Sequence, residues 1–353
     1  MSKERHAVWE NSDLKDLKNM KETEGQQIQS GEMPPGKKQE GIIWQRFPVM
    51  FFTALFCCIL WGSASPSIKI AYRLFRIGAD DTASRIMLAG TRFTLSGCLT
   101  VLIGSLISRK FLKLTRSSLP KVLVLSLFQT VGQYYFLFMA FANTSGVRGS
   151  IINASGNFFA ILCAVYIFRL EKMTLQKLAG CIIGFLGITM ILGGITAFFA
   201  GGGFRLEGEG AMFLGALFYA VAGCLLKIYS RSEDPVLLCG YQFIVGGLVL
   251  FFLGMAMGGR LVFYTPACWL NLIYMGFISV GAYTLWGILL KYNPVSRVSI
   301  LGFMNPVMGV LLSALFLNEG REAFSMKGVA AIALVSAGII IVNAEKRRSP
   351  AGD

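Results

Sequence analysis

Five polar side chains lie inside long apolar stretches of the sequence: Arg92, Gln129, Gln133, Asn153 and Asn157. Burying such a group without a hydrogen-bond partner costs roughly 2–7 kcal/mol, so each of them needs one. For the four amides the partner is either a polar substrate or a neighbouring helix, and the sequence favours neither. For Arg92 the alternatives are an anionic group of a substrate, which a guanidinium binds with two parallel hydrogen bonds, and backbone carbonyls of a neighbouring helix.

A polar stripe also follows the first apolar stretch, which contains Trp61 and the helix-bending Pro66. The stripe recurs at helical spacing and consists of Cys58, Gly62, Ser65, Lys69 and Arg73. Such a stripe either lines a cavity or lets neighbouring helices approach closely. We expect Trp61 and Ser65 to line a cavity, whereas Lys69 has a structural role, with its long side chain reaching the lipid headgroups.

The second half of the chain carries polar and aromatic residues at comparable depth, so a binding site would draw on both halves. These residues are Tyr283, Trp286, Ser299 and Asn305. The predicted substrate-binding set is therefore Trp61, Ser65, Arg92, Gln129, Gln133, Asn153, Asn157, Tyr283, Trp286 and Asn305.

Residues for catalysis are missing from the apolar stretches. No Asp or Glu lies in the interior of a predicted span, and the single histidine, His6, precedes all of them. Acid–base pairs and carboxylate–metal sites therefore lack their residues, and there is no GxxxxGK[ST] loop for ATP. The eight cysteines have no CxxC spacing and are interpreted as small apolar side chains. The sequence predicts no enzyme, no metal and no cofactor, and it favours neutral, zwitterionic or anionic substrates over lipophilic cations.

The composition places most of the chain in a lipid bilayer. Of 353 residues, 54% are apolar and 15% are charged, too few charges for a water-soluble surface. The formal net charge is +14, but acidic and basic residues balance in 1–46. The excess therefore lies in the membrane part, which indicates basic cytoplasmic loops rather than nucleic-acid binding. Residues 1–47 do not resemble a cleaved signal and are expected to form a polar cytoplasmic tail.

Ten apolar segments are long enough to cross a ~30 Å hydrocarbon core as helices, which predicts an all-α polytopic membrane protein. Their approximate ranges are 48–72, 86–107, 119–141, 149–168, 175–198, 209–229, 236–257, 268–290, 295–317 and 325–343. Lys and Arg concentrate in the tails and the even-numbered loops. Both termini are therefore expected in the cytoplasm, and the loops around Gly78 and Gly201 outside.

The sequence is also duplicated. Residues 88–93 align with 238–243 without gaps, and Gly97 and Gly104 align with Gly247 and Gly254. Further pairs at a constant offset include Tyr135 with Tyr283, Asn157 with Asn305, Glu171 with Glu319, and Gly180 with Gly328. Each half has five spans, so the second enters the membrane from the opposite face, as in many alternating-access transporters. The predicted units are 1–47, 48–198, 209–343 and 344–353.

With these features the sequence resembles the drug/metabolite transporter superfamily, in its two-repeat EamA-type branch. The resemblance covers about 48–343. It rests on Leu60-Trp61-Gly62-Ser63, Arg92-Phe93, the FRLEKMT segment at 168–174, Asn305-Pro306-Val307 through Leu317-Asn318-Glu319, and Gly328. It implies that spans 1–4 and 6–9 surround a central cavity, with spans 5 and 10 packed together at the side. The halves differ where Phe158 matches Pro306, and where Tyr219-Ala220 matches Trp61-Gly62.

Four matched residues are expected to be structural. Glu171 and Glu319 follow spans 4 and 9 near the start of the next helix, where a carboxylate satisfies free N–H groups. A role in gating or transport is the alternative. Gly180 belongs to a small-residue face of span 5, and Gly328 opens span 10.

Together these features predict a secondary transporter that exports small metabolites across the bacterial cytoplasmic (plasma) membrane by alternating access. The expected partners are a small-molecule substrate and the lipid bilayer, without nucleic acid, and the protein would act as a monomer or homodimer. The alternatives are a passive channel or facilitator and a structural membrane protein that transports nothing. Flux measured in vesicles with and without gradients would separate these cases.

Overall fold

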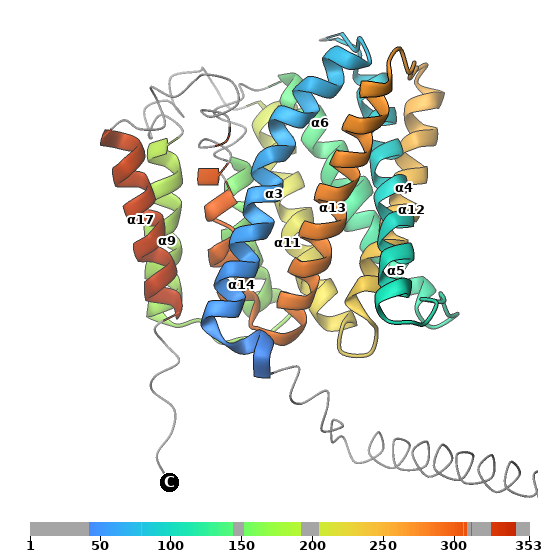
Figure 1. The fold of residues 1–353 in the computed structure, drawn as a ribbon. Helices are drawn as coiled ribbons and strands as arrows, with labels where there is room; N and C mark the ends of the chain where they lie inside the picture. Colours follow the sequence, from blue (N-terminus) through green and yellow to red (C-terminus); the bar gives the residue numbers. More distant parts are fainter. Residues whose placement is uncertain are drawn as a thin grey trace, which may run out of the picture. The chain divides into compact units, whose positions relative to one another are not determined.

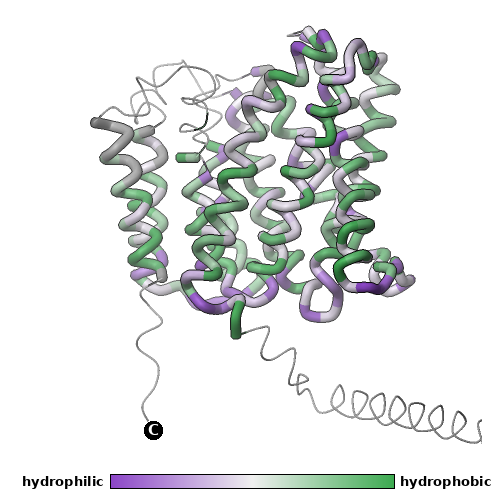
Figure 2. Tube along the Cα trace, viewed as in Figure 1, coloured by the Kyte–Doolittle hydropathy of each residue, from purple (hydrophilic) through white to green (hydrophobic). Residues whose placement is uncertain are grey.

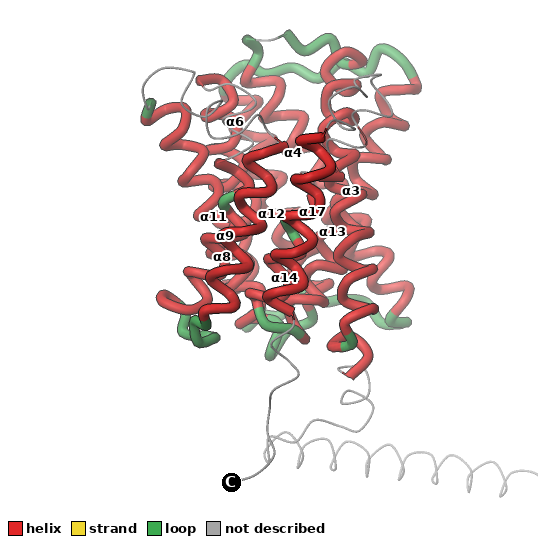
Figure 3. The backbone as a smooth tube through the Cα atoms, turned by 90° about the vertical axis from the view of Figure 1, so that its left-hand side faces the viewer, coloured by secondary structure: helices red, strands yellow, loops and turns green. Residues whose placement is uncertain are grey.

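The computed structural model describes residues 42–78, 80–143, 152–191, 205–305, 307–308, 312 and 326–343. Internal contacts divide the chain into two units, Met1–Val49 and Met50–Asp353. In the first unit, residues 42–45 form one helical turn. The second unit is a helix bundle, and the described residues contain no strand (Figure 3). Most of the amino-terminal tail, all of the carboxyl-terminal tail, the Gly201 loop, Pro306 and Glu319 lie outside the described residues.

Six described segments are long and apolar enough to cross a membrane. They are α3 (Phe47–Leu74), α4 (Thr82–Ile107), α5 (Leu119–Ser126) continued by η1 (Leu127–Gly132) and α6 (Gln133–Asn143), η3 (Leu206–Gly210) continued by α11 (Ala211–Tyr229), α12 (Pro235–Ala256) and α13 (Pro266–Tyr292). Each coincides with a predicted span to within about one helical turn at either end. The prediction of an all-helical membrane protein is confirmed for these segments.

The other predicted spans correspond to shorter described helices. They are α8 (Gly156–Leu162) continued by η2 (Cys163–Ile167), α9 (Leu175–Ile191), α14 (Val295–Leu301) and α17 (Met326–Asn343). Apolar stretches of 10–17 residues occur in three of them, at Ile152–Ile167, Leu175–Gly187 and Ala333–Val342. Of the ninth predicted span, residues 306, 309–311 and 313–317 lie outside the described residues.

The helix ends follow from local sequence. The Asp81 carboxylate accepts a hydrogen bond of 2.9 Å from the Ser84 N–H at the start of α4, and Asp234 accepts one of 2.7 Å from Val236 N–H at the start of α12. Such caps satisfy backbone donors that have no partner within the helix. Figure 2 shows the described helices dominated by apolar residues, with polar residues gathered toward their ends.

Large apolar side chains remain on the outside of the bundle. Phe52 is 66% exposed, Leu106 68% and Leu270 72%. Large exposed apolar side chains on helices of spanning length suit contact with lipid tails. The interior is held together by close helix contacts instead, because apolar side chains gain little by leaving a bilayer for a protein core.

Glycines permit the closest of these contacts. A Cβ at Gly90 of α4 would lie 2.8 Å from the carbonyl oxygen of Gly247 on α12, and a Cβ at Gly97 would lie 2.6 Å from that of Gly240. A Cβ at Gly180 of α9 would likewise lie 2.8 Å from the carbonyl oxygen of Gly338 on α17. Helices α9 and α17 lie side by side in Figure 1 and are those predicted to pair at the side.

Candidate functional site

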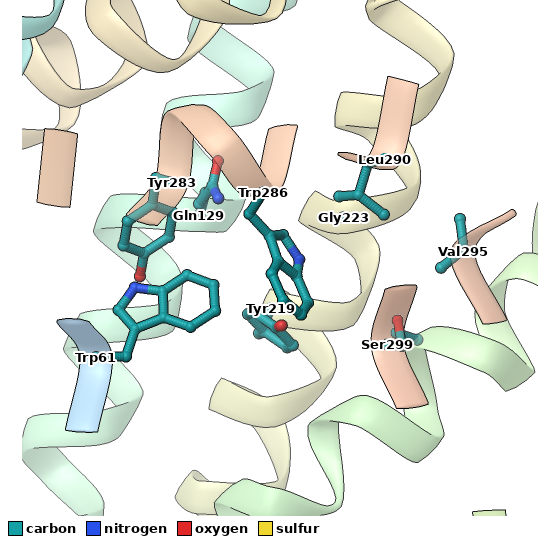
Figure 4. A pocket seen from close by; sticks show the side chains of 10 residues that line it. Trp61, Gln129, Tyr219, Gly223, Tyr283, Trp286, Leu290, Val295 and Ser299 are labelled. Carbon is teal, nitrogen blue, oxygen red and sulfur yellow. The ribbon is translucent and has the colours of Figure 1, made fainter. Parts of the chain in front are cut away.

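A small enclosed space lies where six segments of the bundle meet. Its wall comprises Trp61 (α3), Gln129 (η1), Ala160 (α8), Tyr219 and Gly223 (α11), Tyr283, Trp286 and Leu290 (α13), and Val295 and Ser299 (α14). Figure 4 shows the aromatic side chains converging on this space. The free volume is about 10 Å³, close to what one water molecule needs. We call it the central cavity.

Aromatic rings form one continuous cluster along the wall. The Trp61 ring lies 5.2 Å from the Tyr283 ring and 5.0 Å from the Trp286 ring, both edge-on. Tyr283 continues the contact to Phe243 at 5.0 Å, and the Tyr134 and Tyr283 hydroxyls lie 3.1 Å apart. Edge-to-face pairs add stability beyond their buried area and limit ring rotation. The wall offers flat apolar faces with polar edges.

Two polar atoms of this wall have no hydrogen-bond partner among the described residues. They are the Nε1 donor of Trp61 and the Oε1 acceptor of Gln129, both buried. Leaving such atoms unsatisfied costs about 1–3 kcal/mol each, so their presence requires an explanation. A bound polar molecule that accepts from the indole and donates to the amide would provide one.

The position of Gln129 depends on an irregular helix that the sequence did not predict. Residues of η1 follow π-helical geometry inside an otherwise α-helical span, a distortion often found at functional sites. Gly132 is the last residue of η1, and a Cβ added at Gly132 would lie 2.2 Å from the Phe218 ring of α11. Thr130, the residue after Gln129, donates a hydrogen bond of 2.6 Å from its hydroxyl to Oε1 of Gln242 on α12. These contacts fix the η1 backbone, and hence Gln129, against the second half of the chain.

Polar contacts surround the link between α13 and α14. Leu290 and Val295, on either side of this link, line one end of the cavity. Lys227 Nζ donates to the carbonyl oxygens of Leu290 (2.8 Å) and Asn293 (2.6 Å). The Glu171 carboxylate accepts from the Ser296 N–H at 3.1 Å and from the Ser296 hydroxyl. A cation at the carboxyl end of α13 and an anion at the amino end of α14 both suit the helix dipoles.

Glu171 thus accepts hydrogen bonds at the amino end of α14 rather than at the amino end of α9, the next helix along the chain. It also pairs with Lys177 at 3.0 Å, and both side chains are almost completely buried. Because residue 171 belongs to the first half and Ser296 to the second, this contact ties the two halves together at one end of the cavity.

A larger space of about 470 Å³ lies among α8, α9 and α11, with four phenylalanines in its wall. Its two hydroxyl groups are already engaged, because Ser155 donates to the Ile152 carbonyl and Thr189 to the Leu186 carbonyl. This space therefore offers a polar molecule little to bind, and the central cavity is the better candidate site.

Four of the predicted substrate-binding residues lie together in the cavity wall: Trp61, Gln129, Tyr283 and Trp286. Arg92 and Gln133 lie outside the wall. Arg92 is 7% exposed, with its guanidinium carbon 4.5 Å from the centre of the Phe93 ring, and Phe93 contacts Tyr134 and Phe243 of the aromatic cluster. Its Nε has no partner among the described residues. Arg92 therefore borders the aromatic cluster without reaching the cavity.

The three predicted asparagines are also absent from the wall. Asn153 is exposed, and Asn305, four residues beyond the end of α14, is half-buried. Asn157 is buried, with its Oδ1 so close to Gly302 that a Cβ there would lie 2.4 Å away. The side chains of Ser65 and Lys69 lie outside the described part of the chain. So do the side chains at 326–329 of α17, around Gly328.

Tyr219 is the aromatic wall residue that the predicted substrate-binding set left out. The duplication aligns it with Trp61, and this substitution of one aromatic for another was interpreted as a departure between the halves. Both rings line the same cavity, so the aligned position contributes an aromatic wall from each half. The alignment itself carried that signal.

One carboxylate lies deeper than the sequence indicated. The sixth span begins at Leu206, three residues before the predicted start, and Glu209 within it is 1% exposed. Its Oε2 accepts a hydrogen bond of 3.0 Å from the Arg205 N–H. Glu209 lies at the amino end of this span, where the helix dipole favours an anion. The expectation that no span contains a buried acid is therefore wrong for the amino end of the sixth span.

Comparison with known proteins gives a consistent result. The sequence profile of the EamA-like transporter family matches residues 49–193 and 206–344, once for each half of the chain. An uncharacterized transporter of Archaeoglobus fulgidus is 27% identical over 80% of this chain and 94% of its own length. Probable amino-acid metabolite efflux pumps of Salmonella typhimurium and Escherichia coli are each 24% identical, over 82% and 79% of this chain and 93% and 90% of their own lengths.

A solved crystal structure shares the fold. It superposes with a TM-score of 0.67 over 85% of this chain and 97% of the other chain, at 21% sequence identity. At that identity the similarity concerns the fold alone.

Proposed function

Because the chain belongs to the EamA-like transporter family, we propose that this membrane protein is a secondary transporter that exports small metabolites by alternating access. Relatives named as transporters or efflux pumps over most of their length support a transport function. Export is proposed from the two relatives named as efflux pumps.

The central cavity is the observation that carries this proposal. Its wall takes Trp61, Gln129 and Ala160 from the first matched segment and seven residues from the second. At about 10 Å³ it is far below the 300–1,000 Å³ of typical ligand pockets. A metabolite would enter only if the helices around the cavity separated. A closed cavity between the two halves, without room for a metabolite, fits a substrate-free closed stage of a transport cycle.

Reciprocal contacts between α4 and α12 support ten spans arranged as two inverted repeats. Gly90 approaches Gly247 while Gly97 approaches Gly240. The duplication pairs Gly90 with Gly240 and Gly97 with Gly247, so each contact is the image of the other. Self-complementary contacts of this kind arise from two-fold symmetry. Two repeats related in this way could exchange conformations and open the site to opposite sides in turn.

The chemistry of the site favours a small zwitterionic or anionic metabolite with an apolar part. Trp61, Tyr219 and Trp286 offer flat apolar surface, Gln129 offers an amide oxygen, and Arg92 lies next to the aromatic cluster. The relatives named for amino-acid metabolites fit this class. Amino-acid derivatives are therefore the first substrates to test.

Two measurements test the proposal. Untargeted profiling of media from cells with and without the protein should reveal a metabolite whose external level depends on it. Purified protein in liposomes should then move that metabolite against its gradient, or exchange it, and a Trp61→Ala variant of normal abundance should not. Flux that only follows the substrate gradient and never saturates would indicate a channel. No flux of any profiled metabolite would indicate a structural protein.

A further inference from the structure

Two arginines lie on one face of α4. Arg85 is in the first turn of the helix and Arg92 follows seven residues later. Seven residues make nearly two turns, so the side chains leave the same face about 10 Å apart along the axis. Ala89 lies between them on that face. The sequence analysis singled out Arg92 but not Arg85, because Arg85 falls just before the predicted span.

Neither guanidinium is neutralised by a carboxylate among the described residues. The ion pairs found there are Lys121–Glu233 and Lys177–Glu171. The Nε atoms of both arginines are buried without a partner, although Arg85 Nη2 donates 3.1 Å to the Gly78 carbonyl. The acids nearest in sequence are Asp80 and Asp81, both exposed, and the Asp81 carboxylate accepts from the Ser84 N–H. Two cations on one helix face thus keep unused hydrogen-bonding capacity.

Tyr72 of α3 lies next to the first of these arginines. The Arg85 guanidinium carbon lies 4.9 Å from the centre of the Tyr72 ring. Arg92 leaves the same face of α4 almost two turns further along the helix. A small anion on this face of α4 would therefore meet positive charge from both arginines, and its presence would offset the repulsion between them.

We propose that Arg92 and Arg85 form a two-step binding path for an anionic group, such as a carboxylate, that runs from the aromatic cluster to the end of the bundle where α3 meets α4. The inference rests on the proposed transport function and names the charge of the substrate that uses this route. Each guanidinium offers a bidentate fork to a carboxylate. Because the two arginines are about 10 Å apart along the helix, a carboxylate could move from one guanidinium to the other while it remained attracted to at least one of them. A cationic substrate would be repelled along the same route.

Charged thiol reagents test the path without requiring transport. The reporter is Tyr72→Cys, whose thiol would lie near the Arg85 guanidinium. Ala89→Cys, between the two arginines on α4, is a second reporter with a smaller change. Purified protein is treated with the anionic reagent sulfonatoethyl methanethiosulfonate or the cationic reagent trimethylammonioethyl methanethiosulfonate. Rates are divided by those of 2-mercaptoethanol in solution, and labelling of the parent chain with its eight native cysteines is subtracted.

We expect the anionic reagent to be favoured at both reporters. A unit charge about 7 Å away in a water-like dielectric changes the local concentration of each reagent roughly three-fold, in opposite directions. Adding Arg85→Gln or Arg92→Gln should therefore lower the anion-to-cation rate ratio about five-fold or more. Arg76→Gln is the matched control, because Arg76 is exposed at the same end and its guanidinium carbon lies 4.3 Å from the Tyr264 ring instead; it should change the ratio little.

The outcome separates this inference from the proposed function. Three results would overturn the path, whether or not the protein transports a metabolite. They are equal normalised rates for the two reagents, a rate ratio that Arg85→Gln and Arg92→Gln leave unchanged, and failure of both reporters to react with the anionic reagent. Conversely, a charge-selective path in a protein without flux would leave the path standing and contradict the transporter.

Discussion

Phe93 of α4 stacks on Phe243 of α12, with ring centroids 5.2 Å apart and ring planes 20° from parallel. The two residues are counterparts in the sequence duplication, and both are completely buried. Counterparts that touch each other lie at the centre of a two-fold arrangement, so this stack would mark the axis between the proposed repeats. A change at either ring should then have a similar effect.

The first prediction concerns this stack. Phe93→Leu and Phe243→Leu should each lower the free energy of unfolding by about 1–3 kcal/mol, because each removes a ring from a packed interior. The double variant should lose less than the sum by about 0.5–1.5 kcal/mol, the coupling of an aromatic pair. Thermal unfolding of the purified variants measures both effects. Phe252→Leu is the control, since Phe252 is 54% exposed and should be close to neutral. Additive losses would contradict a coupled central pair.

The second prediction concerns the glycine contacts of α4 and α12. Gly90→Ala and Gly247→Ala should strongly reduce folded protein, because the new Cβ atoms would lie 2.3 Å from Phe251 N and 2.5 Å from Thr94 N. Backbone atoms cannot yield as a side chain can, so the helices would have to separate. Gly78→Ala is the matched control, because nothing lies within 4 Å of a Cβ there. Membrane abundance and monodispersity of the three variants check this. Normal abundance of Gly90→Ala would refute the close contact.

Much of the fold was readable from sequence because lipid imposes a length and a composition on every span. The six long helices begin and end within a turn of their predicted limits for that reason. The π-helical turns were not predicted, because they depend on contacts such as Gly132 with Phe218, between segments far apart in the chain. Hydropathy records that a segment is apolar and carries no information about such local distortions.

The site was predicted in part. Trp61, Gln129, Tyr283 and Trp286 share one cavity wall, since large aromatic and polar residues in mid-span must face other helices. Asn153 illustrates the limit: it lies four residues before Asn157, so the two share one face of a helix, but Asn153 is exposed whereas Asn157 is buried. A stripe predicts which residues share a face, whereas the direction of that face depends on how the whole bundle packs.

The third prediction separates a binding amide from a structural one. Gln129→Leu removes a buried acceptor without a partner, so abundance and stability should be unchanged or slightly improved, while transport should fall ten-fold or more. Gln242→Leu removes the acceptor of the Thr130 hydroxyl and should lower stability by about 1–3 kcal/mol. Liposome flux and melting temperature, measured on both variants, give the comparison. Full transport by Gln129→Leu would exclude Gln129 from the binding site.

The fourth prediction is a pH dependence at the loop between α11 and α12. Burial alone would raise the pKa of Glu233, but hydrogen bonds from Lys121 and Ser118 and the Lys121 charge outweigh it, so the pKa lies below its ordinary value. A lowered folded pKa means that the contribution to stability is complete above the unfolded pKa of about 4.3 and is lost as the pH falls through the folded value. The pair is partly exposed, so the contribution should be about 1 kcal/mol or less.

Melting temperatures between pH 7 and pH 3 test this expectation. Glu233→Gln should melt lower than the parent by a constant amount above about pH 5, and the difference should shrink as the pH falls below the unfolded pKa of about 4.3. Glu207→Gln, at an exposed position, should show no such pattern. A difference that grows as the pH falls would have the wrong sign for a lowered pKa.

The last prediction is the orientation of the bundle. Gly78 and Lys110 are exposed just beyond opposite ends of α4, a helix long enough to cross the bilayer. The Lys and Arg asymmetry places Gly78 outside and Lys110 in the cytoplasm. A membrane-impermeant thiol reagent should therefore label Gly78→Cys in intact cells and Lys110→Cys only after lysis, above the background of the native cysteines. Helices α3 and α17 run in opposite directions in Figure 1, so the chain enters and leaves the bundle on the Lys110 side. The reverse labelling pattern would place both termini outside and would reverse the side on which the Glu171–Ser296 contact closes the cavity.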